Sequence, residues 1–278
     1  MAEDWRAVNR ASWEERTAVH LAPGGYDLSS HRAGLGRLDA IVEAELGPVA
    51  GLRVLDLQSH LGDDSLALAQ RGAAEVVGVD FSPAAVAAAR ALAAETGASG
   101  VRFVEADLYA APAALPGEAG RFDLVFVTWG TIWWLPDIAG WARVAAHFLK
   151  PGGALYFADA HPMAMVFDGA GRPDDPEHRP DWFVPYFHRE PIAYDEPFDY
   201  ANPAARLANS RTIVWMHGLA DILGALRDAG LRLDWLHEHP GLTSPLFPGL
   251  VQGPDRLWTW PGRAWLPLAL SLRAVREA

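Results

Sequence analysis

Two carboxylates lie where short apolar runs end or turn, and their spacing suits a nucleoside ligand. Asp56 is embedded in the run Val54–Leu57, and Asp80 closes the run Glu75–Asp80. Asp80 lies about twenty residues beyond the turn that follows Asp56, the spacing at which an acidic side chain accepts hydrogen bonds from ribose hydroxyls. These residues therefore predict an adenosine-type ligand.

Histidines are the candidate acid–base groups, because imidazole titrates near neutral pH. His161 comes just after the apolar run Ala154–Ala158. Strand carboxyl ends face the ligand in open α/β sheets, so we predict that His161 is a general base or contacts the substrate directly. A hydrogen bond to the following loop is the alternative. His217 is a second candidate for the pocket, whereas we expect His60 to shape the pocket and not to catalyse.

No metal site is predicted. His237 and His239 flank Glu238, and alternate residues of a strand share a face, but no third ligand is near in sequence. The chain has no cysteine, which excludes disulfides, thiolate metal sites and cysteine nucleophiles.

A strand, a turn and a helix must position the first carboxylate. The run Val54–Leu57 has the length of a buried parallel strand, and helical spacing resumes through Leu66 and Ala69 until Gly72. In that order they bring backbone N–H groups and a helix N-terminus to the carboxyl end of the strand. Open α/β sheets bind nucleotide-like ligands there.

Residues 54–62 resemble the first motif of the class I S-adenosylmethionine-dependent methyltransferases, approximately V-L-D-x-G-x-G-x-G. Val54–Leu57 and Gly62 fall on this motif, whereas Gln58 and His60 stand where its first two glycines are expected. Glycine is used there for positive φ and for close backbone approach to the ligand. Gln58 and His60 must therefore either tolerate that backbone or mark a reshaped loop.

Later motifs extend the resemblance. Phe122–Val125 resembles the fourth motif of the family, and Lys150–Gly153 resembles its recurrent helix-stop before a strand. The ordered matches run through about residues 54–160, well under half of the chain.

The resemblance implies S-adenosylmethionine as cofactor, with S-adenosylhomocysteine as product. Asp80 would bind the ribose, Asp107 would accept from the adenine amine, and the Leu108 backbone would contact a ring nitrogen. Capping of the next segment is the alternative role for Asp107. The other cofactor-binding residues would be Asp56, Gln58, Gly62, Phe81, Thr128 and Trp129.

The predicted fold class is α/β: a Rossmann-like, seven-stranded, mostly parallel sheet with helices on both faces. The last strand is expected to be antiparallel, because the resembled fold ends with helix, strand, loop and strand. We expect four parts in chain order: an N-terminal helical lid (1–46), the S-adenosylmethionine-binding core (47–160), an aromatic- and proline-rich insertion that caps the substrate (161–214) and the C-terminal part of the same sheet (215–278).

The lid is predicted as one helix over residues 4–21 and a second over residues 30–46. Trp5, Trp13, His20 and Tyr26 are candidate lid residues, although packing of this segment onto the core would also explain the two tryptophans.

Aromatic residues indicate the kind of acceptor. The chain has 12 tryptophans, several of them in predicted loops, and an aromatic-walled pocket suits a planar ring or a cationic amine. We therefore predict a small-molecule acceptor, aromatic or cationic. The predicted substrate-binding residues are Tyr26, Trp133, His161, Trp182, Tyr186 and His217.

The net charge and the hydropathy of the chain limit the kinds of binding partner that we expect. The net charge is −12, Lys150 is the only lysine, and no basic cluster is present, so nucleic acid is not an expected partner. No long apolar run or basic-then-apolar leader argues for membrane insertion or secretion, and we expect a cytoplasmic protein.

The sequence thus predicts a methyltransferase that acts on a small molecule at oxygen or nitrogen. One alternative is a non-catalytic protein that binds S-adenosylmethionine or S-adenosylhomocysteine, because two glycines are replaced. The other is an NAD-dependent oxidoreductase, but neither an intact dinucleotide glycine fingerprint nor a Tyr-x-x-x-Lys couple is visible.

Overall fold

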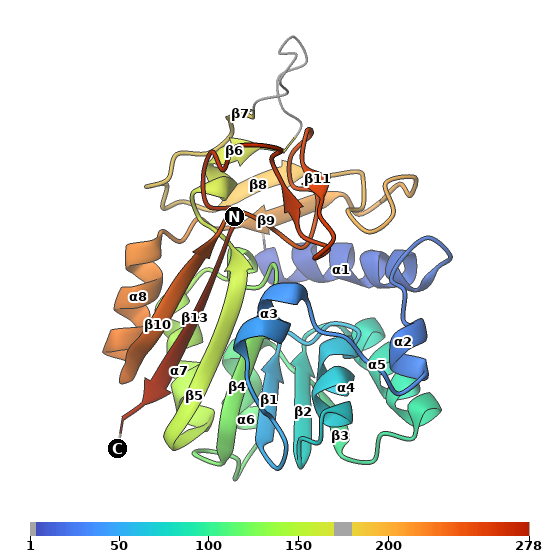
Figure 1. Ribbon diagram of the computed structural model, residues 1–278, viewed down its shortest axis with the longest axis vertical. Helices are drawn as coiled ribbons and strands as arrows, with labels where there is room; N and C mark the ends of the chain where they lie inside the picture. The colour runs from blue at the N-terminus through green and yellow to red at the C-terminus, as the bar shows by residue number, and fades with distance from the viewer. Residues whose placement is uncertain (1–3, 170–179, 278) are drawn as a thin grey trace.

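A computed structural model describes residues 4–169 and 180–277 of the chain (Figure 1). Its centre is a seven-stranded sheet, and the predicted fold class is confirmed. The strands, in sheet order, are β10 (Leu231–His239), β13 (Ala269–Arg276), β5 (Leu149–Ala160), β4 (Phe122–Thr128), β1 (Arg53–Leu57), β2 (Glu75–Asp80) and β3 (Val101–Glu105).

The direction of the strands follows from their connections. Strands β1 to β5 are parallel to one another, because a helical segment follows each of them before the next strand. Strand β13 is antiparallel to both β5 and β10, as expected for the last strand of the chain. The carboxyl ends of β1 to β5 therefore meet at one edge of the sheet, the upper edge in Figure 1.

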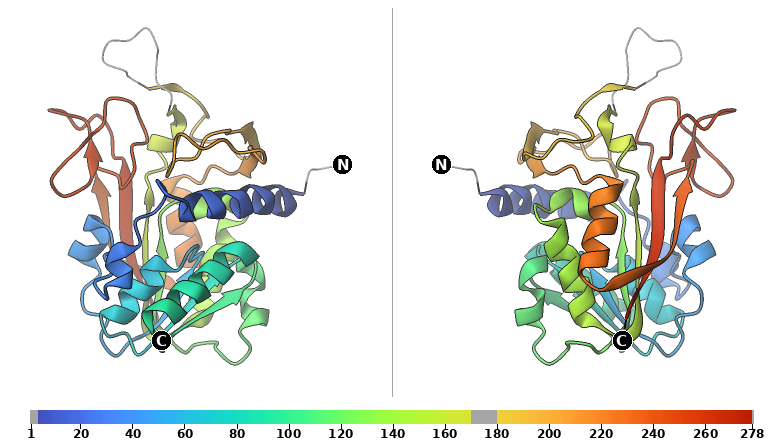
Figure 2. Two further views of the ribbon diagram at one scale, coloured as in Figure 1. Left: turned by 90° about the vertical axis from the view of Figure 1, so that its right-hand side faces the viewer. Right: turned by 90° about the vertical axis from the view of Figure 1, so that its left-hand side faces the viewer.

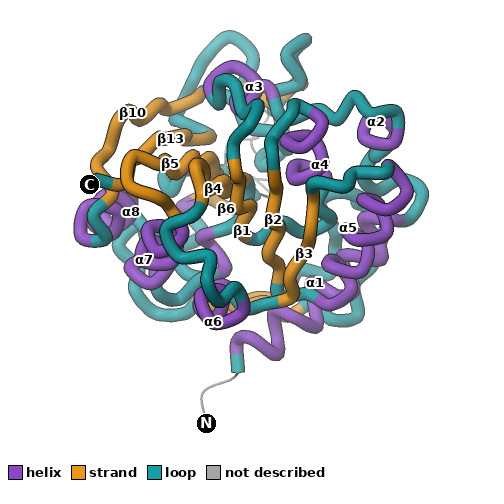
Figure 3. Tube along the Cα trace, turned by 90° about the horizontal axis from the view of Figure 1, so that it is seen from below, coloured by secondary structure: helices purple, strands orange, loops and turns teal. Residues whose placement is uncertain are grey.

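Helices cover both faces of the sheet (Figure 3). One face carries α6 (Ala111–Ala114), α7 (Ile138–Phe148) and α8 (Leu219–Asp228). The other carries α3 (Ala40–Glu45), α4 (Asp63–Gln70) and α5 (Pro83–Thr96). Single-turn helices follow β3 (η1, Leu108–Ala110), β4 (η2, Ile132–Trp134) and β5 (η3, Ala164–Val166).

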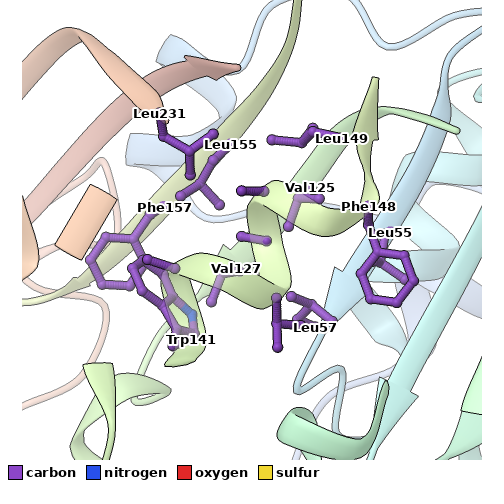
Figure 4. Close-up of a cluster of buried hydrophobic side chains, with 14 of the residues drawn as sticks. Leu55, Leu57, Val125, Val127, Trp141, Phe148, Leu149, Leu155, Phe157 and Leu231 are labelled. Atoms are coloured by element: carbon purple, nitrogen blue, oxygen red, sulfur yellow. The ribbon is translucent and has the colours of Figure 1, made fainter. Parts of the chain in front are cut away.

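The alternation of side chains along each strand divides the core into two halves. Leu55 and Leu57 of β1 face α7, where they pack with Trp141 and other buried side chains (Figure 4). Val54 faces the opposite side and packs with Leu68 of α4. Asp56 shares the face of Val54, so its carboxylate points toward α4.

The N-terminal segment forms one long helix and two short ones. The helix predicted over residues 4–21 is confirmed as α1 (Trp5–Leu21), with Asp4 as its N-cap. The helix predicted over residues 30–46 is wrong, because the segment forms only α2 (Ser29–Arg32) and α3 with a non-helical stretch between them. Gly34 adopts a positive φ of 74° in that stretch, which ends the first helix.

The segment between β5 and α8 lies beyond the carboxyl edge of the sheet and forms two strand pairs (Figures 1 and 2). The pairs are β6 (Phe167–Asp168) with β7 (Asp181–Trp182) and β8 (Ile192–Asp195) with β9 (Arg211–Val214). Residues 170–179 of the predicted insertion lie outside the described residues. A third pair, β11 (Val251–Gln252) and β12 (Trp258–Thr259), belongs to the loop between β10 and β13.

Helix α1 lies between the sheet edge and these strand pairs (Figure 1). Asn9 fixes it to β9 by two hydrogen bonds: its Nδ2 donates to the Ile213 carbonyl at 2.7 Å, and its Oδ1 accepts from the Ile213 N–H at 2.8 Å. Asn9 is 1 % exposed, so this contact is dry and specifies the position of α1. None of the helices described is both long and apolar enough to cross a bilayer.

Candidate functional site

In the turn after β1, two residues other than glycine adopt a backbone conformation that usually requires glycine. Gln58 and His60 have φ values of 62° and 45°, in the left-handed region that disfavours side chains. Both residues therefore tolerate the backbone that the resembled motif gives to glycine. Gly62 also has a positive φ, and a Cβ there would lie 2.4 Å from the Phe103 ring, so this glycine also serves packing.

Asp80 is held in place by its neighbours at the end of β2. Its Oδ2 accepts from the His60 N–H and its Oδ1 from the Ser82 N–H, both at 2.9 Å. Burial raises the pKa of Asp80 to about 6, although the backbone hydrogen bonds oppose this shift. The carboxylate is thus oriented by two elements and still ionised at neutral pH.

Asp56 is buried beneath the start of α4. It is 3 % exposed, and its Oδ2 accepts from Ser65 Oγ at 2.5 Å. Burial raises the pKa of Asp56 to about 7, the Ser65 hydrogen bond opposes the shift, and Asp63 and Asp80 add to it. Asp56 therefore supports the turn from below.

A cavity of about 40 Å³ lies at the carboxyl ends of β1, β2 and β3. Five of the nine predicted cofactor-binding residues line it together: Gln58, Asp80, Phe81, Asp107 and Leu108. Val79 and Ala106 complete the strand ends, and the remaining lining residues are Trp5, Asn9, Trp134 and Leu135.

Helix α1 and the segment after β4 close this cavity from above. Trp5 forms part of the wall, and the Arg6 guanidinium lies 4.3 Å from the centroid of the Trp5 ring. Arg6 Nε also donates to Asp107 Oδ2 at 3.0 Å. Small-molecule pockets typically occupy roughly 300–1,000 Å³, so this cavity is much smaller than an adenosine group would need.

Comparisons of the sequence identify the central part of the chain. Residues 54–153 match the family described as "Methyltransferase domain". A demethylmenaquinone methyltransferase of Thermus thermophilus is 38% identical over 114 residues, which are 40% of this chain and 48% of the relative. A ubiquinone biosynthesis O-methyltransferase of Ralstonia nicotianae is 34% identical over 131 residues, 47% of this chain and 52% of the relative. The chain spans about half the length of these curated relatives.

A solved structure extends the likeness over most of the fold. An S-adenosylmethionine-dependent methyltransferase from Mesorhizobium loti superposes with a TM-score of 0.59 at 25% sequence identity, and the match covers 85% of this chain and 96% of that one. Residues 54–153 thus form a methyltransferase domain, and the chain shares the fold of the class I S-adenosylmethionine-dependent methyltransferases. The family uses S-adenosylmethionine and yields S-adenosylhomocysteine.

The residues around the cavity fit the cofactor of this methyltransferase family. Gln58 Nε2 donates to the Thr131 carbonyl at 3.0 Å, but its Oε1 is buried and has no hydrogen-bond partner among the described residues. A buried acceptor without a donor is costly, and a ligand ammonium or hydroxyl would satisfy it. The polar groups are therefore in place, whereas the cavity must enlarge before an adenosine group fits.

Thr128 and Trp129 end β4 beside an acidic group on α4. Thr128 Oγ1 donates to Asp64 Oδ2 at 3.0 Å, and Trp129 has a positive φ of 54°. Burial raises the pKa values of both Asp63 and Asp64 above the usual range, and the neighbouring Asp63 adds to the shift of Asp64. Thr128 and Trp129 do not line the cavity of the other five residues; they lie on its β4 side.

The histidines predicted for the substrate side of this methyltransferase are engaged in the fold. His161 Nδ1 accepts from the Met163 N–H at 3.0 Å, and its buried Nε2 lies 3.1 Å from Glu238 Oε1. His217 Nε2 donates to the Leu135 carbonyl at 2.7 Å. Burial lowers the pKa values of both imidazoles. One nitrogen of each ring is thus held by a backbone hydrogen bond, whereas His161 Nε2 is buried 3.1 Å from Glu238 Oε1 without an aligned hydrogen bond.

The predicted substrate-binding aromatics are not all brought together. Tyr26 stacks on His20 with ring centroids 4.7 Å apart, and its hydroxyl is 2.6 Å from that of Tyr200. Of the other three, Trp133 belongs to η2, and Trp182 and Tyr186 belong to the insertion. Trp133 packs in a cluster with Val184 and Met216, Tyr186 accepts from the Leu219 N–H, and Trp182 is 72 % exposed.

Sequence reasoning missed a buried polar chain at the C-terminal end of α1. His20 Nδ1 lies 2.7 Å from His60 Nε2, and His20 Nε2 lies 3.1 Å from Asp199 Oδ2. Arg16 Nη1 donates to the same carboxylate oxygen at 3.0 Å. Arg16, His20 and Asp199 are each at most 2 % exposed. The polar stripe of Ser12, Arg16 and His20 at four-residue spacing in a helix was the available signal.

Metal ligation finds no support in residues 4–169 and 180–277. They contain no group of three or more His, Cys, Asp or Glu side chains that could hold a metal ion. His237 and His239 both approach Glu45, at 2.8 Å and 3.5 Å, and His239 Nε2 is also 2.8 Å from Ser271 Oγ.

Proposed function

We propose that the protein transfers a methyl group from S-adenosylmethionine to an oxygen or nitrogen of a small-molecule acceptor. The observation that carries this proposal is the cavity in which Asp80, Asp107 and Gln58 converge, within a methyltransferase-family domain. The lining residues match the adenosine-binding positions that the sequence predicts, and Gln58 Oε1 offers an unpaired acceptor at the same place.

Each wall of the cavity has a role in this proposal. Asp80 accepts from the ribose hydroxyls, Asp107 and Leu108 contact the adenine, and Gln58 and Thr128 hold the methionine end. When bound, S-adenosylmethionine supplies an electrophilic methyl group on a sulfonium. Methyl transfer is an in-line displacement, so positioning and exclusion of water supply most of the catalysis. Trp5 and Trp134 exclude water by closing the cavity from above.

The acceptor is proposed to be aromatic or cationic. Trp129 follows β4, and the Tyr26 hydroxyl lies 2.6 Å from that of Tyr200, so aromatic side chains are available for a planar ring or a cation. The names of the two curated relatives refer to demethylmenaquinone and to ubiquinone biosynthesis, which supports a small molecule with a ring.

Calorimetric titration of the protein with S-adenosylmethionine, S-adenosylhomocysteine and NAD tests the cofactor. Micromolar binding of the first two, weakened by Asp80→Asn, is the expected result. Asp228→Asn is the matched control, because Asp228 is exposed on α8 and pairs only with Arg227 among the described residues. Binding of NAD alone would overturn the proposal.

An acceptor screen tests turnover. Phenols, catechols and primary and secondary amines are incubated with S-adenosylmethionine, and S-adenosylhomocysteine is measured by mass spectrometry. Acceptor-dependent product is expected with at least one class. Tight cofactor binding with no product from any class would favour the non-catalytic binding protein.

A further inference from the structure

The buried face of α1 is polar along its whole length. The buried residues of the helix are Asn9, Ser12, Arg16, Thr17 and His20. Among residues 4–169 and 180–277, none of the apolar clusters of the core has a member on α1. A helix that packs on a sheet usually does so through an apolar stripe. Helix α1 is therefore not held on the sheet by a shared apolar core, and polar contacts decide where it lies.

The most deeply buried of these polar contacts join α1 to the β8–β9 hairpin, defined here as residues 192–214. The Arg16 guanidinium pairs with Asp199 at 3.0 Å, and their side chains are 2 % and 0 % exposed. The two hydrogen bonds between the Asn9 side chain and the Ile213 backbone are also buried. Buried ion pairs and hydrogen bonds are costly to break, because a charged or polar group is then left without water or a partner. Helix α1 and the hairpin are therefore tightly joined.

Two neighbouring glutamates of α1 reach to different sides of the helix. Glu15 Oε2 accepts from the Asn209 N–H at 2.7 Å and from Asn209 Nδ2 at 3.1 Å, on the hairpin. Glu14 Oε1 accepts from the Ala84 N–H at 3.3 Å and from the Ser82 hydroxyl, both at the start of α5. The two side chains thus mark the hairpin side and the sheet side of α1.

The contacts of α1 with the sheet and its turns are more open to water. Arg6 Nε donates to Asp107 Oδ2 at 3.0 Å, but the Arg6 side chain is 47 % exposed. The hydrogen bonds from Glu14 to α5 and between His20 and His60 are only partly buried. Ion pairs exposed to water contribute little to stability, because the solvent screens them. Separation of α1 from the sheet therefore costs less free energy than its separation from the hairpin.

The hairpin lies on the side of α1 away from the sheet (Figures 1 and 2). It joins the rest of the chain at the end where Ile192 pairs with Val214. The Trp215 N–H, just beyond this end, donates to the Trp133 carbonyl at 2.8 Å. Asp199 lies in the loop at the other end, between β8 and β9. The hairpin is thus attached to the body of the protein at one end and to α1 at the other, and this layout lets it turn about the attached end.

The cofactor cavity of about 40 Å³ must enlarge before S-adenosylmethionine fits, and two of its lining residues, Trp5 and Asn9, belong to α1. We propose that α1 and the β8–β9 hairpin move away from the sheet as one body when the cofactor enters. This inference rests on the proposed function. The helix parts from the turn after β1 and from the start of α5, and it keeps its buried contacts with the hairpin.

Paired cysteines test this motion, because the chain has no cysteine of its own. One double variant, Glu14→Cys with Ala84→Cys, places thiols across α1 and the start of α5. The matched double variant, Glu15→Cys with Asn209→Cys, places them across α1 and the hairpin. Each pair is closed with a short bismaleimide, because a direct disulfide has stricter geometric limits. Calorimetry measures the affinity for S-adenosylhomocysteine before and after closure.

The two cross-links are expected to act differently. The Glu14–Ala84 cross-link should lower the affinity by about tenfold or more, because it holds α1 on the sheet and so reduces the population of the open form. The Glu15–Asn209 cross-link should change the affinity by less than about twofold, because its two ends move together. A long, flexible bismaleimide at the Glu14 and Ala84 positions should restore the affinity, because it permits the displacement.

The outcomes separate this inference from the proposed function. Failure of the unmodified protein to bind S-adenosylhomocysteine would remove the proposed function and this inference with it. If the unmodified protein binds, unchanged affinity after the Glu14–Ala84 cross-link would overturn the inference alone, because the cavity would then enlarge elsewhere. An equal loss after the Glu15–Asn209 cross-link would also overturn it, since α1 would then have to leave the hairpin. So would a loss that the long linker fails to restore.

Discussion

The two ends of α1 contact two regions of the molecule that differ in how far apart their residues lie in the sequence. At its N-terminal end, Trp5 and Arg6 lie over Asp80, which ends β2, and Asp107, which follows β3 by two residues. At its C-terminal end, His20 lies between His60 and Asp199. The carboxylates of the first region are placed by local strand–turn–helix segments. The polar chain of the second exists only when segments from three parts of the chain meet.

Removal of Arg16 should have the largest effect on stability. Arg16→Met leaves the buried Asp199 without its permanent countercharge, and breaking a buried ion pair costs about 3–5 kcal/mol. Denaturant unfolding of the purified protein measures the loss. Arg227→Met is the control, because Arg227 is 78 % exposed and its pair with Asp228 contributes little. Equal stability of the two variants would show that Asp199 does not depend on α1.

Asp80→Asn tests the region at the N-terminal end of α1, in which Asp80 lies. The substitution keeps the shape of the side chain but removes the charge that would accept from the ribose, and hydrogen bonds to charged groups contribute about 1.5–3 kcal/mol. Affinity for S-adenosylhomocysteine should therefore fall about tenfold to a hundredfold. The unfolding free energy should change much less than in Arg16→Met. If Asp80→Asn lowered the unfolding free energy but left the affinity unchanged, Asp80 would serve the stability of the fold and not cofactor binding.

The fold itself followed closely from the sequence, for a physical reason. Buried parallel strands are short apolar runs, so β1, β2, β3 and β4 are visible in the chain without any knowledge of their partners. Asp80 and Asp107 stand at the ends of such runs, and their position at the sheet edge follows from the parallel arrangement.

The second region could not be predicted in this way. Arg16 and Asp199 are separated by 183 residues, and nothing in either local sequence indicates the other. The same is true of the Ser30–Leu46 segment, where apolar spacing predicts a continuous helix. Gly36 instead donates its N–H to Gln70 Oε1 on α4, so a tertiary contact overrides the local pattern. For Gln58 and His60 the sequence left two alternatives, and the positive φ values decide between them.

The pH dependence of the unfolding free energy gives a further test of the region formed by local strand–turn–helix segments, because Asp56 belongs to that region. Its folded pKa of about 7 exceeds the unfolded value, so the folded state releases a proton as pH rises while the unfolded state has already lost it. The contribution of Asp56 to the unfolding free energy should fall by about 1 kcal/mol between pH 6.5 and 8. Asp56→Asn should flatten this slope in thermal unfolding series, and an unchanged slope would contradict the assignment.

Arg6→Ala should have the smallest effect. The Arg6–Asp107 pair is partly exposed, so the unfolding free energy should change by less than about 1 kcal/mol. The substitution frees Asp107 and loosens Trp5, and the affinity for S-adenosylhomocysteine should rise by about two- to fivefold. Calorimetry beside Arg10→Ala, a neighbouring exposed arginine of α1, measures the difference. A decrease specific to Arg6→Ala would mean that the pair supports binding.

The position of α1 has a kinetic consequence. The helix carries Trp5, which lines the cofactor cavity, and His20, which lies between His60 and Asp199, on one segment of 17 residues. A displacement of the whole helix that opened the cavity would therefore also separate His20 from His60. This arrangement favours a compulsory order in which the donor binds first, and a pre-steady-state burst of product when reopening is slower than the transfer step.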